Sequence, residues 1–202
     1  MSQEDIQPKQ HPSLNLPKGD STVEVQIINT TCDIVVPAEA FVQPVIKGHE
    51  TMNLPTFAFY LKHKKSGRSV MFDLGCRKDW WNFAPTIHDL IKRAIPGLNV
   101  PKNINEILEE GNVDQSKIDT LIWSHWHWDH TGDPSLFPKS AELVVGPGFK
   151  EAFMPGYPAK NDSPMLETDF EYGSASSCHA SDFDPAPLAA YPVLDQTLTV
   201  RY

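Results

Sequence analysis

The sequence predicts an α/β protein, because segments with the pattern of strands alternate with segments that have the spacing of helices. Residues 23–27 alternate apolar and polar side chains, which is typical of a half-buried strand. Residues 86–95 place their apolar side chains at helical spacing, at Ile87, Leu90, Ile91 and Ala94. A group of histidines follows directly on an apolar run, in residues 122–133, which indicates a functional loop at the end of a buried strand.

Length and composition are those of one globular domain. The chain has 202 residues, of which 40% are hydrophobic, and this is enough to bury a core. A net charge of −9 argues against a nucleic-acid partner, which would require a basic face. No apolar run approaches the ~20 residues that span a membrane, so no membrane partner is expected. The three widely spaced cysteines and the absence of a secretory signal at the start predict a cytoplasmic protein.

The first quarter of the chain is expected to contain two strands. Residues 1–20 are rich in Gln, Lys, Pro and Ser and are predicted to be disordered. After the strand at 23–27, residues 34–36 predict a second strand that ends at Pro37, and the segment as far as Pro55 is expected to be irregular.

Two further strands are expected at residues 57–61 and 69–72, joined by a polar turn at 64–67 that contains a glycine. Asp73 and Gly75 close the second of these strands. A buried carboxylate at Asp73 could orient a ligand histidine, and an ordinary turn aspartate is the alternative.

The later elements continue the alternation of helices and strands. Residues 80–83 are expected to form an aromatic loop, and Pro96 and Gly97 stop the helix at 86–95, where His88 lies on the polar side. The remaining expected elements are a short helix at 103–110, a buried strand at 117–123, a strand at 142–145, a short helix at 149–153 and a loop at 154–164 that could wall a pocket.

The histidine-rich motif is the strongest functional indication. It reads Ser-His-Trp-His-Trp-Asp-His-Thr-Gly, and neutral imidazole and carboxylate are ligands that zinc and related ions prefer. If the segment is extended, His125, His127 and Asp129 share one face, and His130 requires the chain to turn. Such a set can serve one or two metal ions, one held mainly by the first two histidines and the other by Asp129 and His130. The alternative is a histidine-rich surface loop.

The pattern Ser-His-x-His-x-Asp-His-x-Gly resembles that of the metallo-β-lactamase superfamily, in particular a lactonase-like branch of fungal hydrolases. Similarity extends over roughly residues 23–172, including a hairpin at 57–75 that ends in Asp-x-Gly. The resemblance implies an αββα sandwich of two halves packed sheet to sheet, with the metal site between them. It also implies that the segment before Pro55 lies near the mouth of the active site, where three side chains could contact a substrate, namely Phe41, Val42 and Met52. Packing of these side chains on the core is the alternative. The resemblance also implies Zn²⁺, one or two ions, bound by His125, His127, Asp129 and His130.

The end of the chain departs from the family pattern. No Gly-His follows the motif, and the expected division is a first segment at 1–20, a metallo-β-lactamase-like domain at 21–172 and a divergent tail at 173–202. The second half is therefore expected to be incomplete, as in a truncated family member, with apolar sheet surface left exposed. Four tail residues are weak candidates for the missing ligands, namely His179, Asp182, Asp184 and Asp195.

The resemblance implies hydrolysis of a small-molecule substrate. The expected reaction opens a lactone, lactam or cyclic carbamate ring by metal-activated water, and Asp129 could also act catalytically by passing a proton to the leaving group. A thioesterase of the glyoxalase II type and a truncated, non-catalytic remnant of the family are the two alternatives. Trp126 and Trp128 alternate with the ligands, so they are expected to face the core, and an aromatic substrate clamp is the other possible role. The sequence does not predict an oligomeric state.

Overall fold

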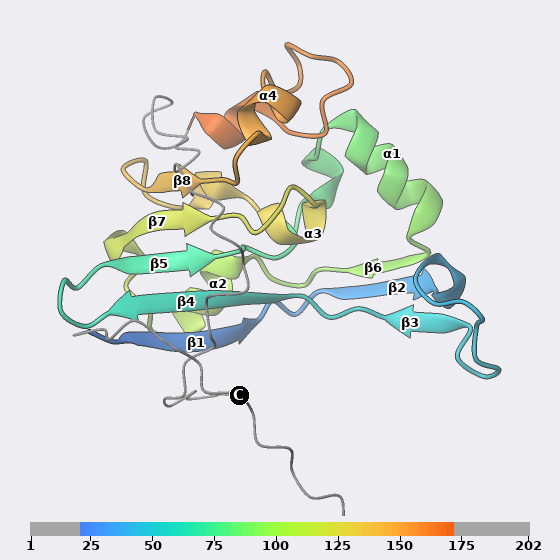
Figure 1. Ribbon diagram of the computed structural model, residues 1–202, viewed down its shortest axis with the longest axis horizontal. Helices are drawn as coiled ribbons and strands as arrows, with labels where there is room; N and C mark the ends of the chain where they lie inside the picture. The colour runs from blue at the N-terminus through green and yellow to red at the C-terminus, as the bar shows by residue number, and fades with distance from the viewer. Residues whose placement is uncertain (1–20, 172–202) are drawn as a thin grey trace, which may run out of the picture.

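The computed structural model describes residues 21–171, and its centre is a five-stranded sheet (Figure 1). The strands lie in the order β1-β4-β5-β7-β8. β1, β4 and β5 pair antiparallel, whereas β5, β7 and β8 pair parallel. Their bounds are β1 Val23–Asn29, β4 Phe57–His63, β5 Ser69–Phe72, β7 Ile118–Ile122 and β8 Glu142–Val144. Each of these strands was predicted from its apolar pattern.

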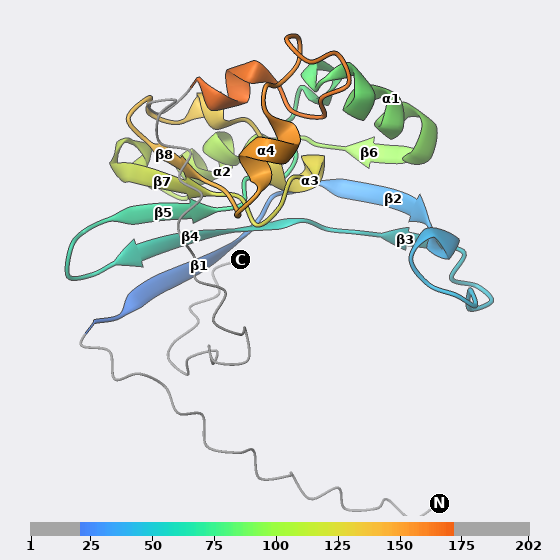
Figure 2. The ribbon, with the colours of Figure 1, turned by 45° about the horizontal axis from the view of Figure 1, so that its top comes forward.

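A smaller three-stranded sheet adjoins the first (Figure 2). β2 lies in the middle of this antiparallel sheet, between β3 and β6. β2 is Asp33–Pro37, β3 is Thr51–Asn53 and β6 is Gly97–Asn99. The sequence predicted β2 but treated the segment that holds β3 as irregular. β3 is only three residues long and is defined by its pairing with β2, so its own sequence carries no strand pattern.

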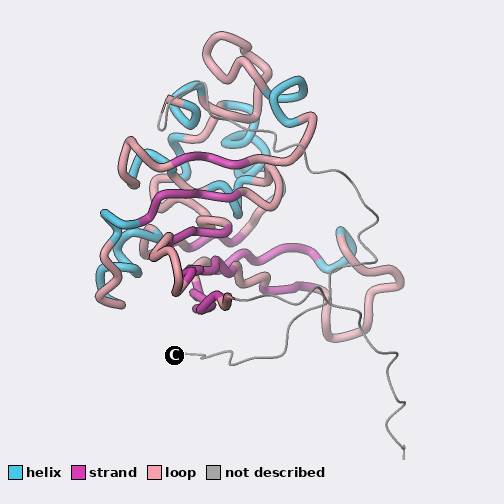
Figure 3. The backbone as a smooth tube through the Cα atoms, turned by 60° about the vertical axis from the view of Figure 1, so that its left-hand side comes forward, coloured by secondary structure: helices cyan, strands magenta, loops and turns pink. Residues whose placement is uncertain are grey.

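The helices are short (Figure 3), and α2 and α4 pack on the same face of the five-stranded sheet. α1 begins with Pro at its first turn, and α2 begins with a capping box between Asn103 and Glu106. The helices are α1 Pro85–Ala94, α2 Ile104–Glu110, α3 Trp128–Thr131 and α4 Phe149–Phe153. The 3-10 turns are η1 Ala38–Ala40, η2 Trp80–Asn82, η3 Gln115–Lys117, η4 Pro134–Leu136 and η5 Glu167–Phe170. Among residues 21–171, no helix has the length and apolar character for crossing a bilayer.

Two apolar cores hold these elements together. The larger core lies on one face of the five-stranded sheet, where Met71 and Leu121 pack against Leu108 of α2 and Phe149 of α4. The smaller core joins β2 to α1 and includes Trp128 of the histidine motif. Trp126 packs against both cores, so the motif lies where they meet.

The opposite face of the large sheet is also apolar but less covered. The pairing register aligns one row of side chains across all five strands, and each member of this row is only partly buried. The row consists of Ile27, Phe59, Phe72, Ile122 and Val144. Phe59 and Phe72 stack edge to face with ring centroids 6.2 Å apart. The described residues therefore present the half-covered apolar sheet face that the sequence led us to expect.

The two faces of β5 should differ in their sensitivity to truncation. Met71 is fully buried in the larger core, so Met71→Ala should lower the free energy of unfolding by about 2–5 kcal/mol. Val70 lies on the opposite, half-covered face, and Val70→Ala should cost less than about 1.5 kcal/mol. Urea unfolding followed by circular dichroism measures both values. Equal costs would mean that both faces are equally buried in solution.

Candidate metal centre

The histidine motif begins where β7 ends. The Trp123 N–H donates to the carbonyl of Val144 at 3.1 Å, which keeps this part of the chain beside β8. The loop after β5 supports the motif, because Leu74 N–H donates to the carbonyl of His130 at 2.8 Å. The motif thus lies on the loop after β7 and is supported by the loop after β5, the neighbouring parallel strand. The ends of such strands are a common place for active groups in layered α/β proteins.

Three imidazole rings come together in the motif. The His125 ring centroid lies 4.6 Å from that of His127 and 4.3 Å from that of His130. His125 and His127 are exposed, whereas His130 is partly buried. The carboxylate of Asp129 lies beside them, with Oδ2 3.3 Å from His130 Nε2. The four side chains singled out from the sequence therefore form one cluster.

The motif is not extended over its whole length. The segment turns into α3 at Trp128, so the expectation that His125, His127 and Asp129 share one face of an extended strand is wrong beyond His127. The His130 N–H donates to the carbonyl of His127 at 2.9 Å, which closes this helical turn. Because of the turn, Asp129 and His130 are brought back towards His125 instead of continuing away from it.

The buried side chain of Asp73 forms hydrogen bonds with both ends of the motif. Its carboxylate is 3% exposed and accepts hydrogen bonds from the Ser124 N–H at 2.7 Å, the Ser124 hydroxyl at 2.7 Å and His130 Nδ1 at 2.9 Å. A hydrogen bond to Nδ1 fixes the orientation of the His130 ring and leaves Nε2 on the side of the other candidate metal ligands. Of the two roles considered for Asp73, the structure supports the orienting one.

The charges in the cluster influence one another. Burial of the His130 ring opposes protonation, but hydrogen bonds with Asp129 and Asp73 outweigh burial and raise the pKa of His130 to about 9. Burial likewise opposes ionisation of Asp129, yet the hydrogen bond and charge of His130 lower the pKa of this carboxyl. Burial and the neighbouring His130 and His127 lower the pKa of His125, which favours its neutral, metal-binding form.

The chemistry of this donor set fits a zinc-type ion, since it combines three imidazoles with an ionised carboxylate. Within residues 21–171, however, no three or more His, Cys, Asp or Glu side chains already converge as a complete metal cage. Binding would therefore require the His130–Asp129 ion pair to open so that both side chains face the ion. The tail candidates His179, Asp182, Asp184 and Asp195 lie outside the described residues.

An apolar pocket of about 260 Å³ adjoins the cluster. His127 and Asp129 contribute to its wall, and the rest is apolar, including Ile87 of α1 and both tryptophans of the motif. Trp128 is thus both a core residue and part of the pocket wall. Phe41 is 61% exposed and also lines this pocket, whereas Met52 packs on the smaller core and Val42 is exposed.

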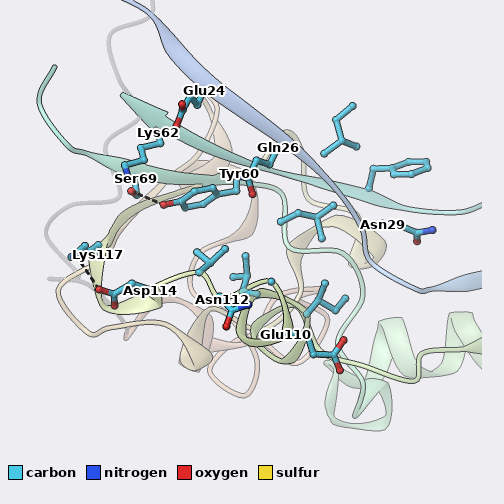
Figure 4. Close-up of a pocket in the computed structure, with 17 residues that line it drawn as sticks. Glu24, Gln26, Asn29, Tyr60, Lys62, Ser69, Glu110, Asn112, Asp114 and Lys117 are labelled. Carbon is cyan, nitrogen blue, oxygen red and sulfur yellow. Dashed lines mark hydrogen bonds and ion pairs between the residues drawn. The ribbon is translucent and has the colours of Figure 1, made fainter. Parts of the chain in front are cut away.

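A second cleft, of about 960 Å³, lies between β1, β4 and α2 (Figure 4). Tyr60 and Ser69 are hydrogen-bonded at 2.9 Å on its wall, and Lys117 pairs with Asp114 at its rim. None of its 17 lining residues belongs to the histidine motif, so this cleft is separate from the candidate metal centre.

Sequence reasoning missed a buried ion-pair network beneath the motif. The Arg77 guanidinium, with 10% of its side chain exposed, pairs with Asp79 at 2.8 Å and with Asp133 at 3.1 Å. Asp133 directly follows the motif, so these contacts hold the chain where it leaves the candidate metal centre. Burial raises the pKa of nearby Asp169 to about 7. No local pattern could have revealed the pairing, because Arg77 and Asp133 are 56 positions apart.

The sequence is similar to known proteins over most of its length. Residues 52–198 match the family model described as the Metallo-beta-lactamase superfamily. Gamma-lactamase FDB1 of Fusarium pseudograminearum (strain CS3096) is 41% identical over 165 residues, which are 79% of this chain and 40% of that protein. Metallo-hydrolase mfmC of Annulohypoxylon moriforme is 37% identical over 167 residues, which are 81% of this chain and 44% of that protein. The chain therefore spans less than half of the length of either relative.

Two crystal structures of N-acyl homoserine lactone hydrolases share the fold. The quorum-quenching enzyme matches with a TM-score of 0.52 and 18% identity, over 75% of this chain and 54% of that chain. A second structure, which has the product N-hexanoyl-L-homoserine at its catalytic metal centre, matches with a TM-score of 0.51 and 17% identity. That match covers 75% of this chain and 56% of the other. At this level of identity the likeness concerns the fold alone.

Gly132 should tolerate no side chain. Its φ is +53°, and a Cβ there would lie 2.5 Å from Leu74 Cβ, on the loop that supports the motif. Gly132→Ala should lower the free energy of unfolding by about 2–5 kcal/mol. Gly146→Ala is the control, because a Cβ at Gly146 meets nothing within 4 Å, and its cost should stay within about 1 kcal/mol. Chemical denaturation measures both, and equal effects would refute the close approach.

The metal-free protein should lose stability in mild alkali. The pKa of His130 is about 9 in the folded chain and 6.5 as its model value, so its stabilising effect is complete below pH 6.5 and disappears as pH rises through 9. The free energy of unfolding, measured with chelator present, should fall by about 1–3 kcal/mol over that range. Asp73→Asn should flatten this slope, whereas His88→Gln should preserve it. His130→Gln removes the titrating ring itself, so a slope that this variant leaves unchanged would exclude His130 as its source.

Proposed function

The chain belongs to the metallo-beta-lactamase superfamily, and from that premise we propose that it is a metal-dependent hydrolase that opens a lactone, lactam or cyclic carbamate ring. The observation that carries the proposal is the cluster of His125, His127 and His130 with Asp129, at the wall of an apolar pocket. The family membership supports the reaction class, and the geometry of the cluster supports the choice of residues.

The residues that would hold the metal are His125, His127, Asp129 and His130, and zinc is the proposed ion, with one or two per chain. Zinc bound there supplies Lewis acidity, which brings the pKa of a water molecule to about 7 and polarises a carbonyl group. Asp73 would contribute by holding the His130 ring at Nδ1, which leaves Nε2 as the nitrogen that could bind the ion.

Asp129 is the candidate catalytic carboxylate. Its lowered pKa keeps it ionised at neutral pH, so it can accept a proton from the attacking water and return it to the leaving group of the opened ring. Its side chain is 23% exposed, which leaves it accessible from the pocket. The two roles, ligand and proton carrier, are compatible because a carboxylate has two oxygens.

The apolar pocket favours a substrate with an apolar group next to the scissile ring. A volume of about 260 Å³ is slightly below the range of drug-sized ligand sites, so it suits a single ring system or a short chain. Gamma-lactamase FDB1 and the lactone hydrolases are named for ring substrates. None of the relatives described above is named a thioesterase, and no observation in the structure favours the glyoxalase II alternative.

Removing one ligand should separate an enzyme from a family remnant. His127→Ala should lower zinc content and reduce kcat/KM by more than the roughly 10–100-fold typical of residues that only support a ligand. His88→Ala is the matched control and should retain activity. His88, in α1, contacts Trp80 of η2 and belongs neither to the motif nor to the pocket lining. Metal analysis by mass spectrometry is combined with hydrolysis assays on lactone, lactam and thioester substrates.

The outcomes of this experiment are distinct. Wild type that is metal-poor and as inactive as His127→Ala would support the non-catalytic remnant. Activity on thioesters alone would replace the ring-opening proposal with the thioesterase alternative.

A further inference from the structure

Two cysteines lie side by side behind the histidine motif. Cys32 lies in the connection between β1 and β2, and Cys76 lies three positions after Asp73. Both are almost completely buried, at 1% and 2% exposure, and both belong to the smaller core together with Trp128. The candidate metal chemistry uses neither of them.

The two thiols are in contact although they are far apart in sequence. The Cys32 and Cys76 side chains lie within hydrogen-bonding contact of each other. The Cys76 thiol donates its proton to the carbonyl of Arg77 at 3.4 Å. The backbones that carry them are close as well, since a Cβ added at Gly75 would lie 2.7 Å from Cβ of Thr30. Joining the sulfur atoms would therefore need only a small movement of two loops that already touch.

The surroundings of the two thiols shift their pKa values in opposite directions. The contact with Cys76 lowers the pKa of the Cys32 thiol, whereas the same contact and burial raise the pKa of Cys76. A lowered pKa favours the thiolate, so the first, attacking step is assigned to Cys32.

We propose that Cys32 and Cys76 form a redox-active dithiol that closes to an intramolecular disulfide when hydrogen peroxide oxidises it. The Cys32 thiolate attacks one peroxide oxygen, the O–O bond breaks, and the products are a sulfenic acid and, with the proton lost from Cys32, one water. The Cys76 sulfur then attacks the sulfenic sulfur, the S–O bond breaks, and hydroxide leaves with the Cys76 proton as a second water. Two electrons pass from the two thiols to peroxide, and one S–S bond forms.

The cross-link would stiffen the support of the candidate metal centre. It would tie the β1–β2 connection to the loop whose Asp73 holds Ser124 and His130. It would also close a loop between positions 44 residues apart (76 − 32), which restricts the unfolded chain. The oxidised chain should therefore melt on the order of 5–10 °C above the reduced chain.

The test uses the full chain, reduced, freed of metal and treated with one equivalent of hydrogen peroxide, the amount that the two steps consume. Thiols counted after denaturation should fall from three to one, and the intact mass should fall by about 2 Da, the mass of two hydrogen atoms. Peptide mapping should show Cys32 linked to Cys76, and dithiothreitol should restore all three thiols and the lower melting temperature.

Three variants serve as controls. Cys178→Ser should lose both remaining thiols at the wild-type rate, because that cysteine takes no part. Cys32→Ser and Cys76→Ser should form no intramolecular link. If either of these two fails to fold, the peptide map of Cys178→Ser still decides, because only one pairing is then possible.

Several outcomes would overturn the proposal. These are three thiols that persist in peroxide, a link that includes Cys178 or a second chain, and a gain of oxygen mass on either cysteine without a link. An oxidised chain that melts no higher than the reduced one would overturn the stiffening of the loop.

Discussion

The carboxylate of Asp73 is the contact on which the candidate site depends. It accepts three hydrogen bonds, two from Ser124 at the start of the motif and one from His130 near its end. Asp73 itself adopts φ +57°, so the chain turns sharply as it leaves β5 and presents the carboxylate to the neighbouring loop. One buried group thereby fixes both ends of the seven-residue segment 124–130 and brings His130 back towards His125.

This arrangement explains why the motif lies between the two cores. The parallel pairing of β5 and β7 places their carboxyl ends side by side, and the two loops that follow must share the same space. Trp126 and Trp128 pack on the cores, while His125 and His127 are exposed and Asp129 and His130 are partly buried. Gly132 then allows the chain to pass Leu74 closely before Arg77 and Asp133 pair.

The period of apolar side chains was sufficient to predict the elements whose burial pattern is regular along their length. β4 and β5 alternate between a buried and a half-buried face, and α1 buries Ile87 and Ile91 on one side, so their patterns were readable. β3 was missed because three residues carry no period and only pairing with β2 makes them a strand. α3 was missed because its four residues follow a loop and its start is marked only by His127, a poor helix-capping residue.

The metallo-β-lactamase-like fold and the clustering of the motif were predicted correctly, yet the contacts that order the site were only partly foreseen. Asp73 could be suspected because its motif is local, but nothing near Arg77 in sequence points to Asp133. The same applies to Cys32 and Cys76, which come together only because β1 leads into β2 alongside the turn after β5. Long-range contacts of this kind depend on the register of whole strands, which local composition does not encode.

The loop after β5 therefore has two neighbours with different chemistry. On one side Asp73 faces the imidazoles, and on the other side Cys76 faces Cys32. Only Leu74 and Gly75 separate the two residues, and both are tightly packed, against Gly132 and Thr30 respectively. A change in the position of Cys76 can hardly be absorbed by such a short, crowded segment, because close-packed interiors transmit displacement instead of damping it. The proposed disulfide would therefore act on the histidine cluster through this four-residue loop.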